Sequence, residues 1–243
     1  MSTTDETGAT DKSAGSSNTG KTVTALEVQK RNKDRVNVYL DGEFAFGLGL
    51  LEAAQLRKGQ RLSEAEIAAL TSQDSVQQAY ERAVRFLGVR PRSIAEVRRN
   101  LTEKETAPAM IDEVITRLEA HGYVDDLAFA QFWISNRQQF RPRSSRALRF
   151  ELREKGVPNN ILDEVLAQFD GIEAAYQAAR DKARRYSNLD ARAFREKIGA
   201  FLARRGFDYA TVREVTDRLI NEQTENITDD ADSNSSFENN IEE

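Results

Sequence analysis

The sequence contains no cysteine, so disulfide bonds and thiolate metal sites are both excluded. No run approaches the roughly 18 consecutive apolar residues that a membrane-spanning helix needs. Residues 1–20 are rich in Ser, Thr, Gly and Asp and lack the apolar centre of a signal peptide. We therefore expect a soluble, cytoplasmic protein that does not associate with membranes.

The net charge of −5 is unevenly distributed along the 243 residues. Residues 1–20 carry −2 and residues 221–243 carry −8, so the body at 21–220 carries +5. Segments with so few apolar side chains cannot offset the entropy lost on ordering, which predicts disorder at 1–21 and at 222–243. The acidic tail has two open interpretations: it screens a nucleic-acid site on the body, or it only keeps the protein soluble.

The segment 22–73 has the pattern of a small β-domain. Val23–Val28 and Val36–Leu40 are rich in β-branched and apolar residues, and Asp41-Gly42 is a strong hairpin signal before a third short run. This pattern predicts a three-stranded antiparallel meander. Two short helices are expected after it, at residues 50–56 and 63–70.

From Ser75 onward the pattern is helical and repeats itself. The tetrapeptide Arg90-Pro-Arg-Ser93 recurs as Arg141-Pro-Arg-Ser144, at an offset of 51 residues. Gly156 recurs as Gly206 at an offset of 50. Self-similarity at a fixed period is typical of repeat architectures. We predict a mainly α-helical fold with three tandem three-helix repeats, at residues 74–124, 125–170 and 171–221.

Helix-terminus signals fall at matching positions within these repeats. Ser93 with Glu96 forms a capping box before an apolar stripe, and Pro108 suits the first turn of the next helix. Gly122 and Gly156 are placed to end helices.

Four motifs occur in the order found in the RecX family, across about residues 75–220. Arg90-Pro-Arg-Ser93, Gly122-Tyr-Val-Asp-Asp126, Glu151-Leu-Arg-Glu-Lys-Gly156 and Leu202-Ala-Arg-Arg-Gly-Phe207 each resemble a segment of that family. Two departures stand out: Leu127-Ala128 replaces a frequent Glu-Arg pair, and the third repeat has Asn188-Leu-Asp190 instead of the Arg-Pro-Arg-Ser turn.

The resemblance implies a function that periodicity and charge could not supply. RecX proteins bind filaments of the RecA recombinase on DNA, limit their extension or promote their disassembly, and so regulate recombination, DNA repair and the SOS response. It implies a regulator, mainly an inhibitor, that acts as a monomer on the RecA filament, with single- or double-stranded DNA as a possible further partner.

The predicted filament-binding surface consists of arginine residues. The planar guanidinium of arginine suits phosphates and carboxylates. Nine arginines in the first two repeats are the predicted filament-binding residues: Arg90, Arg92, Arg98, Arg99, Arg137, Arg141, Arg143, Arg146 and Arg149. Any one of them has a simpler interpretation, which is solvation of an outer face or pairing with Glu96, Glu103 or Glu151. We expect the array as a whole to form a groove for a polyanion or an acidic protein.

Catalytic and metal-binding patterns are absent from the sequence. The lone His121 stands at a predicted helix C-terminus, where a cationic ring interacts favourably with the helix dipole. Asp125 and Asp126 are interpreted as a helix N-cap and a first-turn acid rather than as magnesium ligands. No phosphate-binding glycine loop occurs. We expect a protein without enzymatic activity, metal or cofactor.

Two alternatives stay open. The first is a DNA-binding protein that competes with RecA for single-stranded DNA, which predicts strongly salt-dependent binding to naked DNA. The second is a metal-dependent nuclease using Asp125, Asp126 and Asp163, for which the sequence offers no clustered ligand set.

Overall fold

The computed structural model describes the backbone of residues 20–238 and the side chains of residues 20–224. The chain divides into two compact units, one up to Ala79 and one from Tyr80 onward. The disorder expected for residues 1–19 and 239–243 concerns positions outside the described residues.

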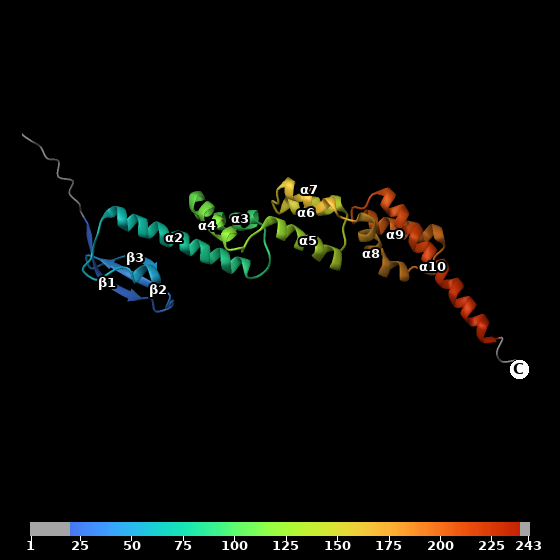
Figure 1. Ribbon diagram of the computed structural model, residues 1–243, viewed down its shortest axis with the longest axis horizontal. Coiled ribbons are helices and arrows are strands. Elements are labelled where there is room, and N and C mark those ends of the chain that lie inside the picture. Colours follow the sequence, from blue (N-terminus) through green and yellow to red (C-terminus); the bar gives the residue numbers. More distant parts are fainter. Residues whose placement is uncertain (1–19, 239–243) are drawn as a thin grey trace, which may run out of the picture. The chain divides into compact units, whose positions relative to one another are not determined.

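The first unit, drawn in blue at one end of Figure 1, is built around an antiparallel sheet. The strand order of this sheet is β3-β2-β1-β4. Its strands are β1 (Lys21–Val28), β2 (Arg35–Leu40), β3 (Glu43–Gly49) and the two-residue β4 (Arg61–Leu62). Asp41 and Gly42 both have positive φ, 50° and 91°, as a tight two-residue hairpin requires. The predicted meander is therefore confirmed, and β4 adds a short fourth strand beside β1.

Alternating residues of the sheet form the core of this unit. Val36, Val38 and Leu40 are buried on β2, with Val23 on β1 and Leu48 on β3 beside them. Leu62 of β4, together with Ala53 and Leu56, belongs to the same core. Two-residue alternation is what a sheet with one buried face demands.

One helix differs from its expected form. The short helix expected at 63–70 and the first helix of the repeats are a single helix, α2 (Glu64–Leu87). No Gly or Pro interrupts this stretch, and Thr71 and Ser75 turn their hydroxyls back onto the carbonyls of Ile67 and Thr71, at 2.8 and 2.9 Å. The helix expected at 50–56 is shorter, α1 (Leu50–Ala53).

The second unit contains the three predicted repeats. The end of α2 is followed by α3 (Ile94–Glu103) and α4 (Pro108–Ala120) in the first repeat. The second repeat has α5 (Asp126–Phe140), α6 (Ser145–Glu154) and α7 (Asn159–Ala167), and the third has α8 (Gly171–Arg184), α9 (Ala191–Ala203) and α10 (Tyr209–Glu238). In the described part of the chain, no helix is both long and apolar enough to cross a membrane.

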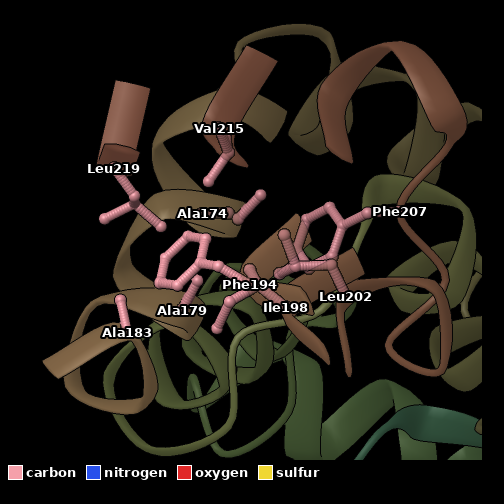
Figure 2. Packing of buried hydrophobic residues seen from close by; sticks show 10 residues of the cluster. Ala174, Ala179, Ala183, Phe194, Ile198, Leu202, Phe207, Val215 and Leu219 are labelled. Carbon is pink, nitrogen blue, oxygen red and sulfur yellow. The ribbon is translucent and has the colours of Figure 1, made fainter. Parts of the chain in front are cut away.

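The second and third repeats each have a small hydrophobic core. In the third repeat, Ala175, Ala179 and Ala183 of α8 pack against Phe194, Ile198 and Leu202 of α9. Val215 and Leu219 complete this core from α10, and Figure 2 shows side chains of all three helices directed into it. Alanines on α8 allow the helix to approach Phe194 closely.

The sequence predicts a disordered tail at 222–243. In the structure the backbone of this segment is helical as far as Glu238, where α10 ends.

Neighbouring repeats meet through the ends of their second helices. At the first junction, the Ser93 hydroxyl donates to the carbonyl oxygen of Lys155 at 2.5 Å. At the second junction, the Ser144 amide donates to the carbonyl oxygen of Arg205 at 3.3 Å. The glycine that follows each of these carbonyls, Gly156 or Gly206, has a left-handed φ of 81° or 90°. The end of each later helix thus lies against the N-terminus of the equivalent helix one repeat earlier.

The first junction has no room for a side chain at Gly156, because a Cβ there would collide with the Cβ of Ala95. Gly122 provides a matched control, since its φ is also left-handed, at 69°, but its Cβ would meet nothing within 4 Å. We expect Gly122→Ala to lower the free energy of unfolding by about 1–2 kcal/mol through backbone strain alone. Gly156→Ala should lower it by a further 1–3 kcal/mol or so through overpacking.

Urea unfolding followed by the fluorescence of Trp133, the single tryptophan, measures both changes. Equal losses of stability in the two variants would contradict a tightly packed junction.

Candidate interaction surface

The arginine-rich turns that precede α3 and α6 lie at the two junctions between repeats. Ser93 and Ser144 are the N-caps of these helices and accept hydrogen bonds from the amides of Glu96 and Ala147, at 3.1 and 3.2 Å. Because a serine N-cap fixes where each helix starts, it also fixes the place of the arginine just before it. The predicted capping box is confirmed at Ser93 and Glu96.

Glu96 is the electrostatic centre of the first junction. Its carboxylate accepts hydrogen bonds from Arg90 at 2.8 Å and from Lys155 of the next repeat at 3.1 Å. Partial burial acts to raise the pKa of Glu96, but the bonds from Arg90, Lys155 and the Ser93 amide outweigh it and lower the pKa from 4.5 to about 2. The same contact raises the pKa of Arg90.

A hollow of about 540 Å³ opens beside this junction, between the first and second repeats. Phe86, Trp133 and Phe150 contribute aromatic surface to it. Four cations and four carboxylates share the rest of the lining: Arg92, Arg99, Arg137, Lys155, Glu96, Glu103, Glu151 and Glu154. The hollow is therefore amphipathic and electrically balanced rather than uniformly basic.

Four of the nine predicted arginines form close ion pairs with carboxylates, at 2.6–2.8 Å. Arg90 bonds Glu96, and Arg137 bonds Glu151 at 2.7 Å. Arg98 bonds Asp112 and Arg149 bonds Asp163, both at 2.6 Å. The last two pairs are equivalent across the repeats and tie the second helix of each repeat to its third. Because both are largely exposed, each stabilises the fold by about 1 kcal/mol at most.

Two further arginines pack against the protein itself. The Arg92 guanidinium lies 3.5 Å from the centre of the Phe86 ring and donates to the Phe86 carbonyl at 3.0 Å. Burial and the neighbouring Arg90 lower the pKa of Arg92. Arg99 donates to the carbonyl oxygens of Ala95 and Glu154, both at 3.4 Å.

The remaining three arginines belong to the second junction. Arg143 lies 3.7 Å from a Glu151 oxygen, whereas Arg141 and Arg146 are exposed and form no ion pair or hydrogen bond through their side chains within the described residues. Arg205, from the third repeat, joins them by donating to the Pro142 carbonyl at 2.9 Å.

The predicted filament-binding residues did not include Arg205 or the other cations of the third repeat, although Arg204 and Arg205 lie within the motif at 202–207. Residues 171–220 hold eleven Lys and Arg against seven Asp and Glu, whereas residues 75–170 hold fifteen against fourteen. Most of the net positive charge of residues 21–220 therefore belongs to the third repeat. Counting charge repeat by repeat, rather than searching for recurring arginine motifs, would have found it.

The acidic pair Asp125-Asp126 has a structural role. Asp125 is the N-cap of α5 and accepts from the amides of Leu127 and Ala128, at 2.8 and 3.1 Å. Asp126 is buried and accepts from the amide of Ile94, at the start of α3, at 2.9 Å. Burial raises the pKa of Asp126, and the bond from Ile94 opposes that rise. Asp126 thus joins the second repeat to the first, whereas Asp125 caps a helix within the second repeat.

The other candidates for chemistry are also engaged in the fold. The Nδ1 atom of His121 is 2.9 Å from the Tyr80 hydroxyl, and His121 is the C-cap of α4, as predicted. Asp163 is held by Arg149. Among the residues whose side chains are described, no group of three His, Asp or Glu is placed to hold a metal ion.

Comparison with known proteins identifies the family. The model "Regulatory protein RecX N-terminal domain" matches residues 21–63, and the first, second and third three-helix domains of RecX match residues 79–118, 125–166 and 170–216. "Regulatory protein RecX" of Bacillus pumilus is 31% identical over 205 residues, which cover 82% of this chain and 76% of that protein. The chain belongs to the RecX family.

Other RecX proteins agree in sequence and fold. "Regulatory protein RecX" of Leuconostoc mesenteroides is 31% identical over 212 residues, covering 85% of this chain and 79% of that protein. A crystal structure of regulatory protein RecX superposes with a TM-score of 0.64 at 28% identity, over 81% of this chain and 99% of that one. A crystal structure of RecX from Lactobacillus salivarius shares the fold, with a TM-score of 0.54 at 23% identity over 60% of this chain and 97% of that one.

The low pKa of Glu96 has a measurable consequence. A carboxyl group whose pKa is depressed by folding stabilises the protein above its unfolded pKa, here 4.5, and loses that contribution as the pH falls towards 2. Replacing Glu96 by Gln should lower the free energy of unfolding at pH 7 by about 1.5–3 kcal/mol, the typical value of a charged hydrogen bond. The difference from wild type should shrink steadily between pH 4.5 and 2.

Urea unfolding across this pH range measures that difference. Glu103→Gln is the control, because Glu103 is exposed and has no ion pair in the described chain. A deficit in Glu96→Gln that did not change with pH would show that altered packing, rather than the missing charge, caused it.

Proposed function

We propose that the protein is a non-enzymatic modulator, mainly an inhibitor, of the RecA recombinase. It binds the RecA–DNA filament and limits the filament's extension or promotes its disassembly, which regulates recombination and DNA repair. Membership of the RecX family carries this proposal, since the relatives are regulatory proteins and the family's motifs are present in order. Such a regulator does not have to catalyse a reaction. If it binds one state of the filament more tightly than another, it shifts the equilibrium towards the state that it binds.

The predicted arginines contribute unequally to this binding. Arginines already neutralised by an aspartate offer little net charge to a partner, as Arg98 and Arg149 do. Arg141 and Arg146 keep their full charge in solvent and are better placed to bind phosphates or acidic side chains. The filament-binding surface is therefore centred on the second repeat and its junction with the third.

The ATPase activity of RecA on single-stranded DNA tests the proposal directly. Adding the protein at ratios well below one per RecA monomer should reduce ATP hydrolysis, because one bound molecule at a filament end or groove affects many RecA subunits. Inhibition that requires a ratio near one per DNA binding site, together with tight binding to naked DNA, would instead favour competition for single-stranded DNA.

Paired variants test the unequal contribution of the arginines. The double variant Arg141→Ala, Arg146→Ala should raise the concentration needed for half-inhibition of RecA by about tenfold, assuming about 0.7 kcal/mol for each exposed charge contact. The second double variant, Arg98→Ala with Arg149→Ala, removes the same number of positive charges. It should change the concentration needed for half-inhibition by less than about threefold. Equal effects of the two double variants, with both folded, would show that the ion pairs do not mask Arg98 and Arg149.

A further inference from the structure

The two repeat junctions have the same architecture but different charge. Each brings the arginine-rich turn of one repeat against the last residues of the second helix in the next repeat. Arg141 and Arg143 stand where Arg90 and Arg92 stand, and Arg205 takes the place of Lys155. The first junction can therefore serve as an internal reference for the second.

The first junction contains its own counter-ion. Glu96 accepts hydrogen bonds from both Arg90 and Lys155, so two of the three cations there share one carboxylate. The third, Arg92, is stacked on Phe86. This site is complete without a ligand.

The second junction lacks that counter-ion. The position of Glu96 is taken by Ala147, 51 residues later, so no carboxylate enters the site from the first turn of α6. The nearest acid to Arg143 is Glu151, whose oxygen lies 3.7 Å from the guanidinium. Glu151 already accepts from Arg137 at 2.7 Å and from the Trp133 indole at 2.9 Å, so its charge is shared.

Arg205 is held beside Arg141 and Arg143 by contacts with neighbouring residues, although the three cations repel one another. Arg205 donates to the carbonyl of Pro142, the residue between Arg141 and Arg143, and its guanidinium lies 4.6 Å from the centre of the Phe201 ring. Burial, and then the charges of Arg143 and Arg141, lower the pKa of Arg205. Like charges held this close favour the entry of an anion.

Two further exposed arginines stand close to the site in the sequence. Arg146 is in the first turn of α6, and Arg204 is the C-cap of α9. Neither has an ion-pair partner in the described chain. With them, two helix ends supply five arginines, which suits successive phosphates of a strand better than a single small anion.

We propose that the second junction, formed by Arg141, Arg143 and Arg205, is a binding site for the phosphodiester backbone of a nucleic acid. The first junction, closed by Glu96, is not. This inference rests on the proposed function in one respect, because the DNA of the filament would be the strand that the site contacts. It assigns the contact to one place, and it includes Arg205 of the third repeat, which was not among the nine predicted filament-binding arginines.

The variant Ala147→Glu transplants the counter-ion of the first junction into the second. It should remain folded, because Ala147 is only half-buried and the new carboxylate lies in the first turn of α6, close to three arginines. Binding of a fluorescently labelled single-stranded oligonucleotide, without RecA, should weaken by about tenfold at low salt. The logarithm of the association constant falls linearly with the logarithm of the salt concentration. The slope of this line should become shallower by about 0.7 for each phosphate that the variant no longer neutralises.

Ala147→Gln is the matched control. It has the size of Glu and can cap the helix, but it adds no charge, so it should bind the oligonucleotide within about twofold of wild type. Wild-type affinity in Ala147→Glu, with an unfolding midpoint at or above that of wild type, would overturn the proposal. Equal weakening by Glu and Gln would also overturn it, since size rather than charge would then be responsible.

Competitors distinguish the possible sources of the anion. Inorganic phosphate, added at constant ionic strength, should not release the oligonucleotide at low millimolar concentrations; release would assign the site to a small anion and overturn the proposal. Polyglutamate of equal charge should compete poorly, and equal competition would assign the site to an acidic protein. Because RecA is absent, a wild-type protein without effect on the RecA ATPase would refute the proposed function and leave this comparison of variants readable.

Discussion

The contact between the Ser93 hydroxyl and the Lys155 carbonyl is the interaction on which the arrangement of the repeats depends. The helices that it joins, α3 and α6, have ten residues each, and helices of this length are marginal in isolation. Each must gain stability from packing against a neighbour. Gly156 allows the close approach because a left-handed φ of 81° ends α6 without placing a side chain against Ala95. Asp126 adds a second bond at the same helix start, through the Ile94 amide.

Much of this architecture could be predicted from the sequence, because its signals are local or periodic. Ser93, Asp125 and Gly122 act on backbone groups within a few residues of themselves, so their patterns define helix ends directly. The continuity of α2 was not predicted, because the polar residues 71–74 separate two apolar helical patterns. Without Gly or Pro in this stretch, the helix continues through it. The pairing of the arginines could not be predicted, since it depends on residues far apart in sequence, such as Glu96 and Lys155 at a separation of 59.

The distribution of charge shows why recurring arginines alone do not identify the residues that bind a partner. A motif that recurs at the repeat period is retained wherever it supports the repeat itself, and Arg98 and Arg149 do this through equivalent bonds to Asp112 and Asp163. Residues that bind a partner need not recur, because a partner contacts the repeats at different places. The third repeat lacks the Arg-Pro-Arg-Ser turn, so a search for that recurring motif does not find the excess of positive charge there.

Equivalent positions that differ between repeats therefore carry more information about function than those that agree. Both junctions keep the serine, the glycine and the carbonyl contact, so cohesion between repeats does not require an acid at the position of Glu96 and Ala147. Glu96 adds stability where it occurs, and its absence from the second junction leaves three cations close together at a cost in electrostatic repulsion. A fold that can place a carboxylate at this position, and does so one repeat earlier, tolerates that repulsion most readily where an external anion offsets it.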